Sequence, residues 1–330
     1  MSAIFDAISA QYNAAFAWLF SELMQPALYS LGLMNYWDEA YAGTEIVLLG
    51  VLEIALLALI VVPLQRLVPA EAQQERAAVR TDFIYTLVNR LGLLPLISFA
   101  LLFPLEGELD SLSHEMGWPR LTLEGLMPWF VEHQFAAFCV YLLVFDLVGY
   151  WIHRAQHGFN WWWELHAVHH SQQSMTVWTD SRNHFLDDLL TALVIALVAR
   201  AIGTPGMQFV WLVFISRVIE SLSHANVRYG YGKILGRLIV DPLFHRTHHA
   251  IGLGHEGPRR GCNFSVLFPV WDVVFRSANF VPRVEPTGIR DQLQGRDYGA
   301  GLWAQQGLAL QRLWRRLARA PVGAPGGKRA

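Results

Sequence analysis

Histidines are the residues in this 330-residue chain whose types and spacing could do chemistry. Ten of the 13 fall between positions 153 and 249, in one H-x-x-x-H pair, two H-x-x-H-H triplets and two single positions. Residues three and four apart on a helix share a face, so each cluster aims at least two imidazoles the same way. A neutral imidazole nitrogen is a good ligand for iron, zinc, copper or nickel. The candidate ligands are His153, His157, His166, His169, His170, His184, His224, His245, His248 and His249.

The number of these histidines indicates two metal ions, because one ion takes only about four to six ligands. Ten imidazoles cannot pack closely unless something compensates their polarity. Other catalytic patterns are missing: the sequence has no H-E-x-x-H, no C-x-x-C, no Walker A motif and no G-x-G-x-x-G. A redox dimetal centre is the most economical interpretation, with the centre itself as the catalytic group and no separate protein acid or base.

Carboxylates beside the clusters are expected to orient the imidazoles through their second ring nitrogens. Asp146 lies seven residues before His153, two helical turns away on a similar face. The other carboxylates predicted in this role are Asp188 and Asp241, with Asp187 and Asp272 as weaker candidates.

The elements that carry these clusters are expected to be membrane helices. Hydrophobic residues make up 53% of the chain and charged residues 16%, against about 25% charged in soluble domains. Residues 44–63, 83–105 and 128–152 each approach the roughly 20 apolar residues that cross a bilayer. Residues 186–202 and 207–222, separated by G-T-P-G, predict a helical hairpin that is either spanning or re-entrant. The predicted fold is all-α: a polytopic integral membrane protein with a helical cap that carries the dimetal site.

Loop charges predict the orientation of these helices. Residues 64–82 hold three arginines, whereas residues 106–127 hold five acidic residues and one arginine. Basic loops stay in the cytoplasm, so the N-terminus is expected outside and the histidines on the cytoplasmic side of a multi-pass, bacterial inner-membrane protein. The net charge of −2 gives no reason to expect nucleic-acid binding.

Three stretches together are similar to the fatty acid hydroxylase/sterol desaturase superfamily over about residues 130–280. They are D-x-x-x-Y-W-x-H-R-x-x-H from Asp146, W-x-x-H-x-x-H-H-S from Trp163, and H-R-T-H-H from His245 with the later N-F and W-D-x-x-F. The resemblance implies an integral membrane oxygenase with two histidine-bound irons that uses O2 and external electrons. All the candidate ligands match its motifs closely except His184 and His224, which match less well. The sequence departs from the family at Asn263-Phe264-Ser265 and at Phe275-Arg276-Ser277, which bears on the substrate and not on the ligands.

The predicted organisation has four parts. Residues 1–43 form an N-terminal interfacial segment, and residues 44–127 hold the first two transmembrane helices and their loops. Residues 128–285 form the catalytic domain. Residues 286–330 contain a basic amphipathic helix at about 298–320, expected on the anionic leaflet or packed on the domain, and a disordered tail.

The predicted activity is hydroxylation of a C–H bond in a lipid, with sterol, acyl chain, ether lipid, aminolipid and carotenoid all open as substrates. No haem, flavin or nicotinamide site is expected, so a separate ferredoxin, cytochrome or reductase must supply electrons. A desaturase with the same site is one alternative. A non-catalytic zinc-binding or metal-transport membrane protein is the other, but it would require more acidic residues along the spans than Glu53 and Asp146.

Overall fold

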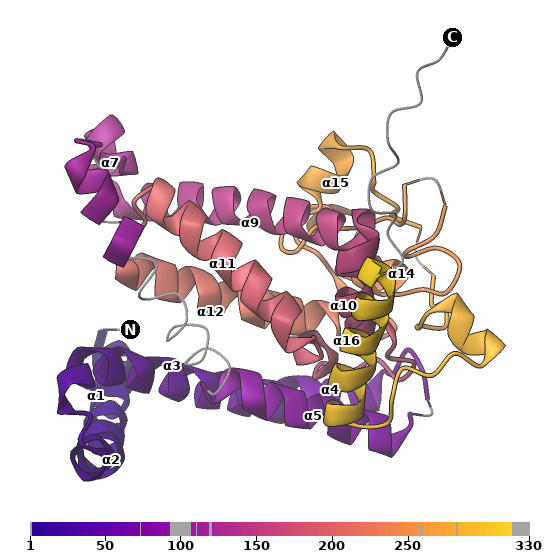
Figure 1. The fold of residues 1–330 in the computed structure, drawn as a ribbon, viewed down its shortest axis with the longest axis horizontal. Helices are drawn as coiled ribbons and strands as arrows, with labels where there is room; N and C mark the ends of the chain where they lie inside the picture. Colours follow the sequence, from indigo (N-terminus) through magenta and orange to yellow (C-terminus); the bar gives the residue numbers. More distant parts are fainter. Residues whose placement is uncertain are drawn as a thin grey trace.

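The fold is that of a helical bundle with a loop-rich cap at one end (Figure 1). A computed structural model describes residues 2–72, 74–92, 107–109, 111–118, 121–257, 259–281 and 283–318. No β-strand forms within these ranges, which agrees with the predicted all-α class.

Among the described residues, two helices are long and apolar enough to cross a membrane. The first comprises α3 (Trp37–Leu56), the π-helical turn η3 (Leu57–Val61) and α4 (Val62–Leu67). The second is α9 (Gln134–Gly158). Only 33% and 28% of their most apolar windows are buried inside the protein. Such broad exposed apolar faces are typical of contact with lipid, so these helices indicate a membrane protein.

The two helices differ from the predicted spans at their ends. The third predicted span divides at His133, because the short helix α8 (Trp129–Glu132) stops before α9 begins. At its other end α9 continues for six residues beyond the predicted limit of 152. This extension carries two buried histidines, which end the apolar pattern but not the helix.

The remaining bundle helices are α5 (Arg76–Arg90), α11 (Phe185–Ala201) and α12 (Gly206–Ser223). The last two form the predicted hairpin around residues 202–205, where Gly203 adopts a φ of +61°. The second predicted span, 83–105, begins inside α5, and residues 93–106 lie outside the described ranges.

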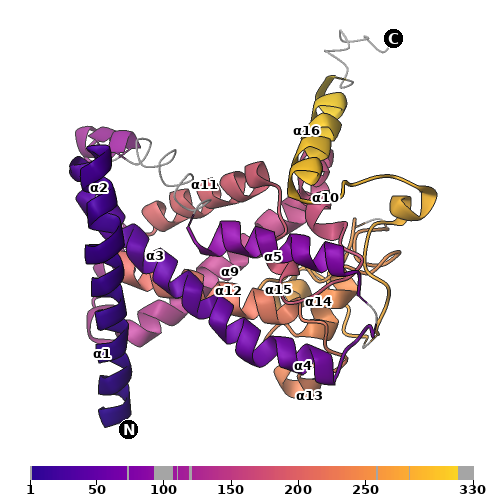
Figure 2. The same ribbon diagram turned by 90° about the horizontal axis from the view of Figure 1, so that it is seen from below.

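The N-terminal helices form one continuous run that stands at a steep angle to the bundle (Figure 2). This run comprises α1 (Ser2–Leu19), the π-helical turn η1 (Phe20–Met24) and α2 (Gln25–Leu31), followed by a 3-10 turn η2 (Met34–Tyr36). Phe20 packs edge-on against Trp37 and Tyr41 at the start of α3.

The cap gathers short helices at the histidine end of the bundle (Figure 1). They are α10 (Asn160–His170), η4 (Thr179–Ser181), α13 (Gly232–Leu235), α14 (Pro242–His248), α15 (Val270–Val274), η5 (Arg290–Gln294) and α16 (Leu302–Ala318), while α7 (Leu123–Leu126) lies at the opposite end.

The C-terminal helix α16 packs directly on α10. Arg316 donates to Glu164 of α10 at 2.7 Å, and Arg312 lies 3.7 Å from the same carboxylate. Its basic face is therefore bound partly to the domain. The predicted disordered tail lies outside the described residues.

Candidate metal centre

Nine of the ten candidate histidines meet in two groups, and all nine side chains are buried. Within each group the ligand atoms all lie within 4.8 Å of one another. The first group contains His153, His157, His166, His170 and His248, and the second contains His169, His224, His245 and His249.

Both H-x-x-H-H triplets contribute to both groups. In α10 the i and i+4 positions, His166 and His170, join the first group, and His169 joins the second. The second triplet does the reverse: His245 and His249 join the second group and His248 the first. The rings of His170 and His249 stack at 4.4 Å between centroids, so the two groups are adjacent.

Local sequence explains how α14 presents its triplet. Asp241 accepts a hydrogen bond from the Phe244 amide at 2.8 Å and caps the helix, and Pro242 occupies its first turn. A capping carboxylate followed by proline is a strong helix start. It fixes the phase of the helix, and so the direction of the histidines that follow.

The Nε2 atoms converge at separations that suit metal ligation. His157 and His248 approach His170 at 3.0 and 3.1 Å, all between Nε2 atoms. In the second group His224 lies 3.2 Å from His169 and 3.0 Å from His245. Metal–imidazole bonds of about 2.0–2.1 Å put neighbouring ligand nitrogens roughly 3 Å apart. Each group can therefore hold one ion.

Carbonyl oxygens fix the second ring nitrogen of several imidazoles. His153 Nδ1 donates to the Phe264 carbonyl at 2.9 Å, and His248 Nδ1 donates to the Cys262 carbonyl at 2.7 Å. His224 Nδ1 donates to the Glu220 carbonyl at 2.7 Å. A carbonyl can only accept, so the proton sits on Nδ1 and the Nε2 lone pair faces the group interior.

Several ring nitrogens in the groups are buried without any hydrogen-bond partner among the described residues, including Nε2 of His153 and His166. Burial, reinforced by neighbouring imidazoles, lowers the pKa of His169, His245 and His249 well below the usual range. These imidazoles are neutral at pH 7 and keep a free lone pair. A buried, neutral, all-nitrogen donor set suits iron, zinc, copper or nickel.

His184 is not brought into either group, so the structure does not support its predicted role as a ligand. Its Nδ1 accepts the Leu186 amide at 3.0 Å and caps α11, and its Nε2 donates to the Gln306 carbonyl of α16 at 3.2 Å. Both ring nitrogens are used by the backbone.

None of the three main carboxylate candidates binds an imidazole, so that part of the prediction is corrected. Asp146 accepts the Leu267 and Phe268 amides and the Trp271 indole. Asp241 caps α14, as described above. Asp188 lines a cavity.

The carboxylate that does reach an imidazole is Asp187, one of the weaker candidates. Its Oδ2 lies 3.1 Å from His166 Nδ1. Its Oδ1 accepts from Trp162 and Gln156 at 2.6 and 2.8 Å, so the carboxylate is fixed at both oxygens.

Residues 260–265 form a loop that the sequence reasoning missed as part of the site. Carbonyls of Arg260, Cys262 and Phe264 receive the Nδ1 protons of three first-group imidazoles. Asp272 anchors the loop by accepting the Phe264 and Ser265 amides at 2.9 and 2.7 Å. Two short motifs that resemble the family could have identified this loop. The N-F pair, Asn263-Phe264, lies in the loop, and the W-D pair, Trp271-Asp272, contains the residue that anchors it.

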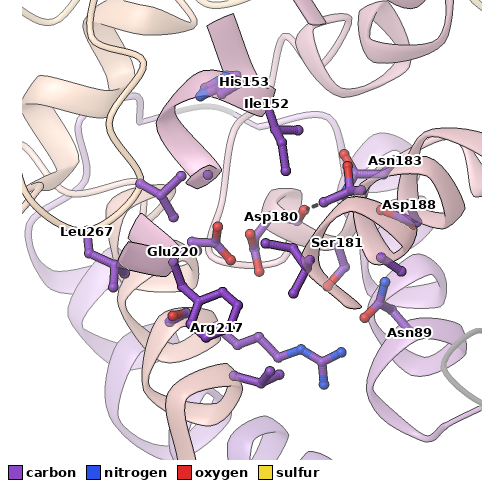
Figure 3. Close-up of a pocket in the computed structure, with 18 of the residues that line it drawn as sticks. Asn89, Ile152, His153, Asp180, Ser181, Asn183, Asp188, Arg217, Glu220 and Leu267 are labelled. Atoms are coloured by element: carbon purple, nitrogen blue, oxygen red, sulfur yellow. Dashed lines mark hydrogen bonds between the residues drawn. The ribbon is translucent and has the colours of Figure 1, made fainter. Parts of the chain in front are cut away.

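A cavity of about 580 Å³ reaches both histidine groups, through His153 and His166 of the first and His169, His224 and His245 of the second. Helices α3, α5, α9, α11 and α12 supply its walls. Figure 3 shows Asp180, Arg217 and Glu220 among the side chains that line it. The volume falls within the range of small-molecule sites, about 300–1,000 Å³.

Residues 138–277 match the family model for fatty acid hydroxylase. The chain is 26% identical to an ornithine lipid hydroxylase, OlsE, of Rhizobium tropici, over 87% of this chain and 82% of that protein. It is 27% identical to an alkylglycerol monooxygenase of Caenorhabditis elegans, over 48% of this chain and 29% of that protein. A methylsterol monooxygenase (1-3) of Arabidopsis thaliana is also 27% identical, over 42% and 47%. The chain thus covers less than half of the last two relatives, and no solved structure gives a significant match.

The family match spans α9, α10, α14 and the anchored loop, and so includes all nine grouped histidines. The relatives are named as lipid hydroxylases and monooxygenases. Residues 138–277 therefore form a fatty acid hydroxylase domain, and the chain is similar to members of the fatty acid hydroxylase/sterol desaturase superfamily, which are oxygen-dependent oxidoreductases.

Proposed function

We propose that this oxidoreductase is a membrane-bound di-iron hydroxylase that inserts one oxygen atom of O2 into a C–H bond of a lipid. The observation that carries the proposal is the pair of adjacent, buried imidazole groups that share one cavity. Nine buried imidazole ligands in two groups suit two redox-active ions better than one structural zinc, which takes four ligands.

The overall reaction is R–H + O2 + 2 e⁻ + 2 H⁺ → R–OH + H2O. Two irons held by the two groups would supply the O2 chemistry. The protein's own residues hold the imidazoles in a single tautomer, through the 260–265 loop and Asp187. Burial of all nine imidazoles would limit the access of bulk water to the reacting centre.

The relatives support a lipid as the substrate, since their names refer to ornithine lipid, alkylglycerol and methylsterol. The three arginines within residues 64–82 favour a multi-pass arrangement in a bacterial inner membrane with the histidine cap on the cytoplasmic side. There, a separate ferredoxin, cytochrome or reductase would deliver the electrons.

A desaturase remains the second candidate, because loss of a second hydrogen at the same centre would give an alkene. Hydroxylation is favoured by the names of the three relatives described above, all hydroxylases or monooxygenases.

The test is mass spectrometry of total lipids from cells that express the protein, His169→Ala or His114→Ala. His169 belongs to the second group, whereas His114 is exposed and outside both groups, which makes it a matched control. A lipid that gains one oxygen atom with the intact protein and the control, but not with His169→Ala, is the expected result. Loss of two hydrogens instead would identify a desaturase.

Metal analysis of the purified protein completes the test. About two irons per chain are expected. One zinc per chain with no lipid change would contradict the proposal in favour of a non-catalytic metal protein.

A further inference from the structure

The cavity wall carries polar side chains that have no hydrogen-bond or ion-pair partner in the part of the chain that the structure describes. Asn89 of α5, Asp188 of α11, and Arg217 and Glu220 of α12 all line it. Among the described residues, no hydrogen bond or ion pair reaches any of these four side-chain ends. They share the cavity with five of the grouped histidines, and its other walls include the apolar residues Ile195, Phe209 and Val213.

The other charged groups of the cavity are already matched. Glu53 pairs with Arg90 at 3.1 Å, and Arg90 also binds Asp180 at 2.5 Å. Asp146 and Asp187 are saturated by the amide, indole and imidazole donors described above. What remains is one guanidinium, Arg217, and two carboxylates, Asp188 and Glu220.

These three ionisable groups come from both helices of the hairpin. Asp188 lies within electrostatic range of Arg217, yet no ion pair joins them. In Figure 3 the Arg217 side chain extends toward the side of the cavity that carries Asn89 and Asp188. Ionisable groups without partners are costly to keep charged inside a protein, and a ligand that brings both an anionic and a cationic group would remove that cost.

We infer that the substrate is a zwitterionic lipid whose oxyanion binds Arg217 and whose ammonium group binds Asp188 and Glu220. The inference has a second half, which rests on the proposed function: the hydroxylase adds the oxygen atom to the polar part of the lipid or to the carbons next to it. A plain hydrocarbon segment in this position would leave all four polar side chains without a hydrogen-bond or ion-pair partner. The apolar wall suits the hydrocarbon attached to the polar group.

Binding can be measured separately from oxygenation. Native mass spectrometry of the purified, metal-loaded protein would compare phosphatidylethanolamine, an N-acyl amino acid lipid with a free ammonium and carboxylate, and uncharged diacylglycerol. At least one zwitterionic lipid is expected to bind about tenfold or more tightly than diacylglycerol. The first two lipids distinguish a phosphate from a carboxylate as the oxyanion.

Charge-removing variants test the assignment of each group. Arg217→Gln and Asp188→Asn are each expected to lose that preference, with unchanged metal content. Arg217→Lys keeps the positive charge and should retain most of it, which separates loss of charge from misfolding. Arg315→Gln and Asp38→Asn, both at exposed positions, are matched controls that should bind as the parent does.

Each result has one meaning. Equal binding of diacylglycerol, or an unchanged preference in Arg217→Gln, would overturn the inference. Selective binding without any oxygenated product, when electrons and O2 are supplied, would leave zwitterion recognition standing and contradict the proposed hydroxylation. If tandem mass spectrometry places the new oxygen far along an acyl chain, the second half of the inference is wrong.

Discussion

Single acceptors orient five of the nine imidazoles in the two groups. For His153, His157, His224 and His248 the acceptor of the Nδ1 proton is a backbone carbonyl. A carbonyl cannot be removed by substitution. For His166 the acceptor is a side chain, Asp187, so this is the one place among these five where the orientation of a ligand can be tested directly.

Replacing Asp187 by Asn should weaken metal binding by roughly 10–100-fold, the usual effect of losing such a partner. The amide can still accept from Trp162, but it loses the charge that favours the Nδ1 proton of His166. Competition with a chelator measures the change, and Asp38→Asn serves as the control. Unchanged affinity would mean that Asp187 does not orient His166.

His184 illustrates what sequence could not predict at this scale. Its place after Ser181-Arg182-Asn183 resembles a family ligand position. Its direction, however, depends on the Gln306 carbonyl, 122 residues later in the chain. Helical spacing works for His153 and His157, because both lie on one helix. It gives no information on a contact between α11 and α16.

At the scale of elements, hydropathy predicted the first and third apolar helices and the hairpin, but it placed the ends of the third poorly. The first span and the hairpin follow from composition and from the G-T-P-G turn. The end of α9 does not, because His153 and His157 face the protein and not the lipid. The 260–265 loop was also beyond prediction as a site element, since it contributes carbonyls, which every residue has.

Close helix packing gives a prediction for α3. A Cβ added at Gly50 would collide with the Arg90 carbonyl at the end of α5, which is backbone and cannot move aside easily. Gly50→Ala should therefore separate α3 from α5 and strain the Glu53–Arg90 ion pair. We expect a loss of about 1–3 kcal/mol, the usual cost of overpacking.

Thermal unfolding in detergent checks this expectation, with Gly307→Ala as the matched control. Gly307 lies in α16, and a Cβ there meets nothing within 4 Å. The same substitution should stabilise that site by about 0.5–1 kcal/mol, because alanine favours the helix. If both variants shift in the same direction, close packing at Gly50 is not what the glycine provides.

At the scale of the whole molecule, the two groups tie together segments far apart in sequence. The first group joins α9, α10 and α14, and the second joins α10, the end of α12 and the α14 triplet. The Nε2 atoms of His153 and His166 are buried and have no hydrogen-bond partner among the described residues, which leaves them available to an ion. Because ions bind these groups only when the segments are assembled, metal binding should be coupled to the stability of the whole cap.

Removal of the metals should therefore lower the unfolding temperature of the intact protein. A ligand present at about 100 times its Kd stabilises the folded state by roughly 2.7 kcal/mol. At about 2–4 °C per kcal/mol, treatment with a chelator should lower Tm by on the order of 5–10 °C, and added metal should restore it. His245→Ala should abolish most of the response, whereas His114→Ala, exposed and outside both groups, should keep it.

Hydrogen exchange can locate the effect, because the same coupling predicts loss of protection in α10 and α14 before α3. Helices α10 and α14 carry the two triplets, whereas α3 carries no grouped histidine. If the metals leave with no change in Tm or in exchange, the imidazole groups are assembled by packing alone. The Phe264, Leu267 and Asp272 core, fully or almost fully buried, would then hold the cap together, and the metals would serve only the chemistry.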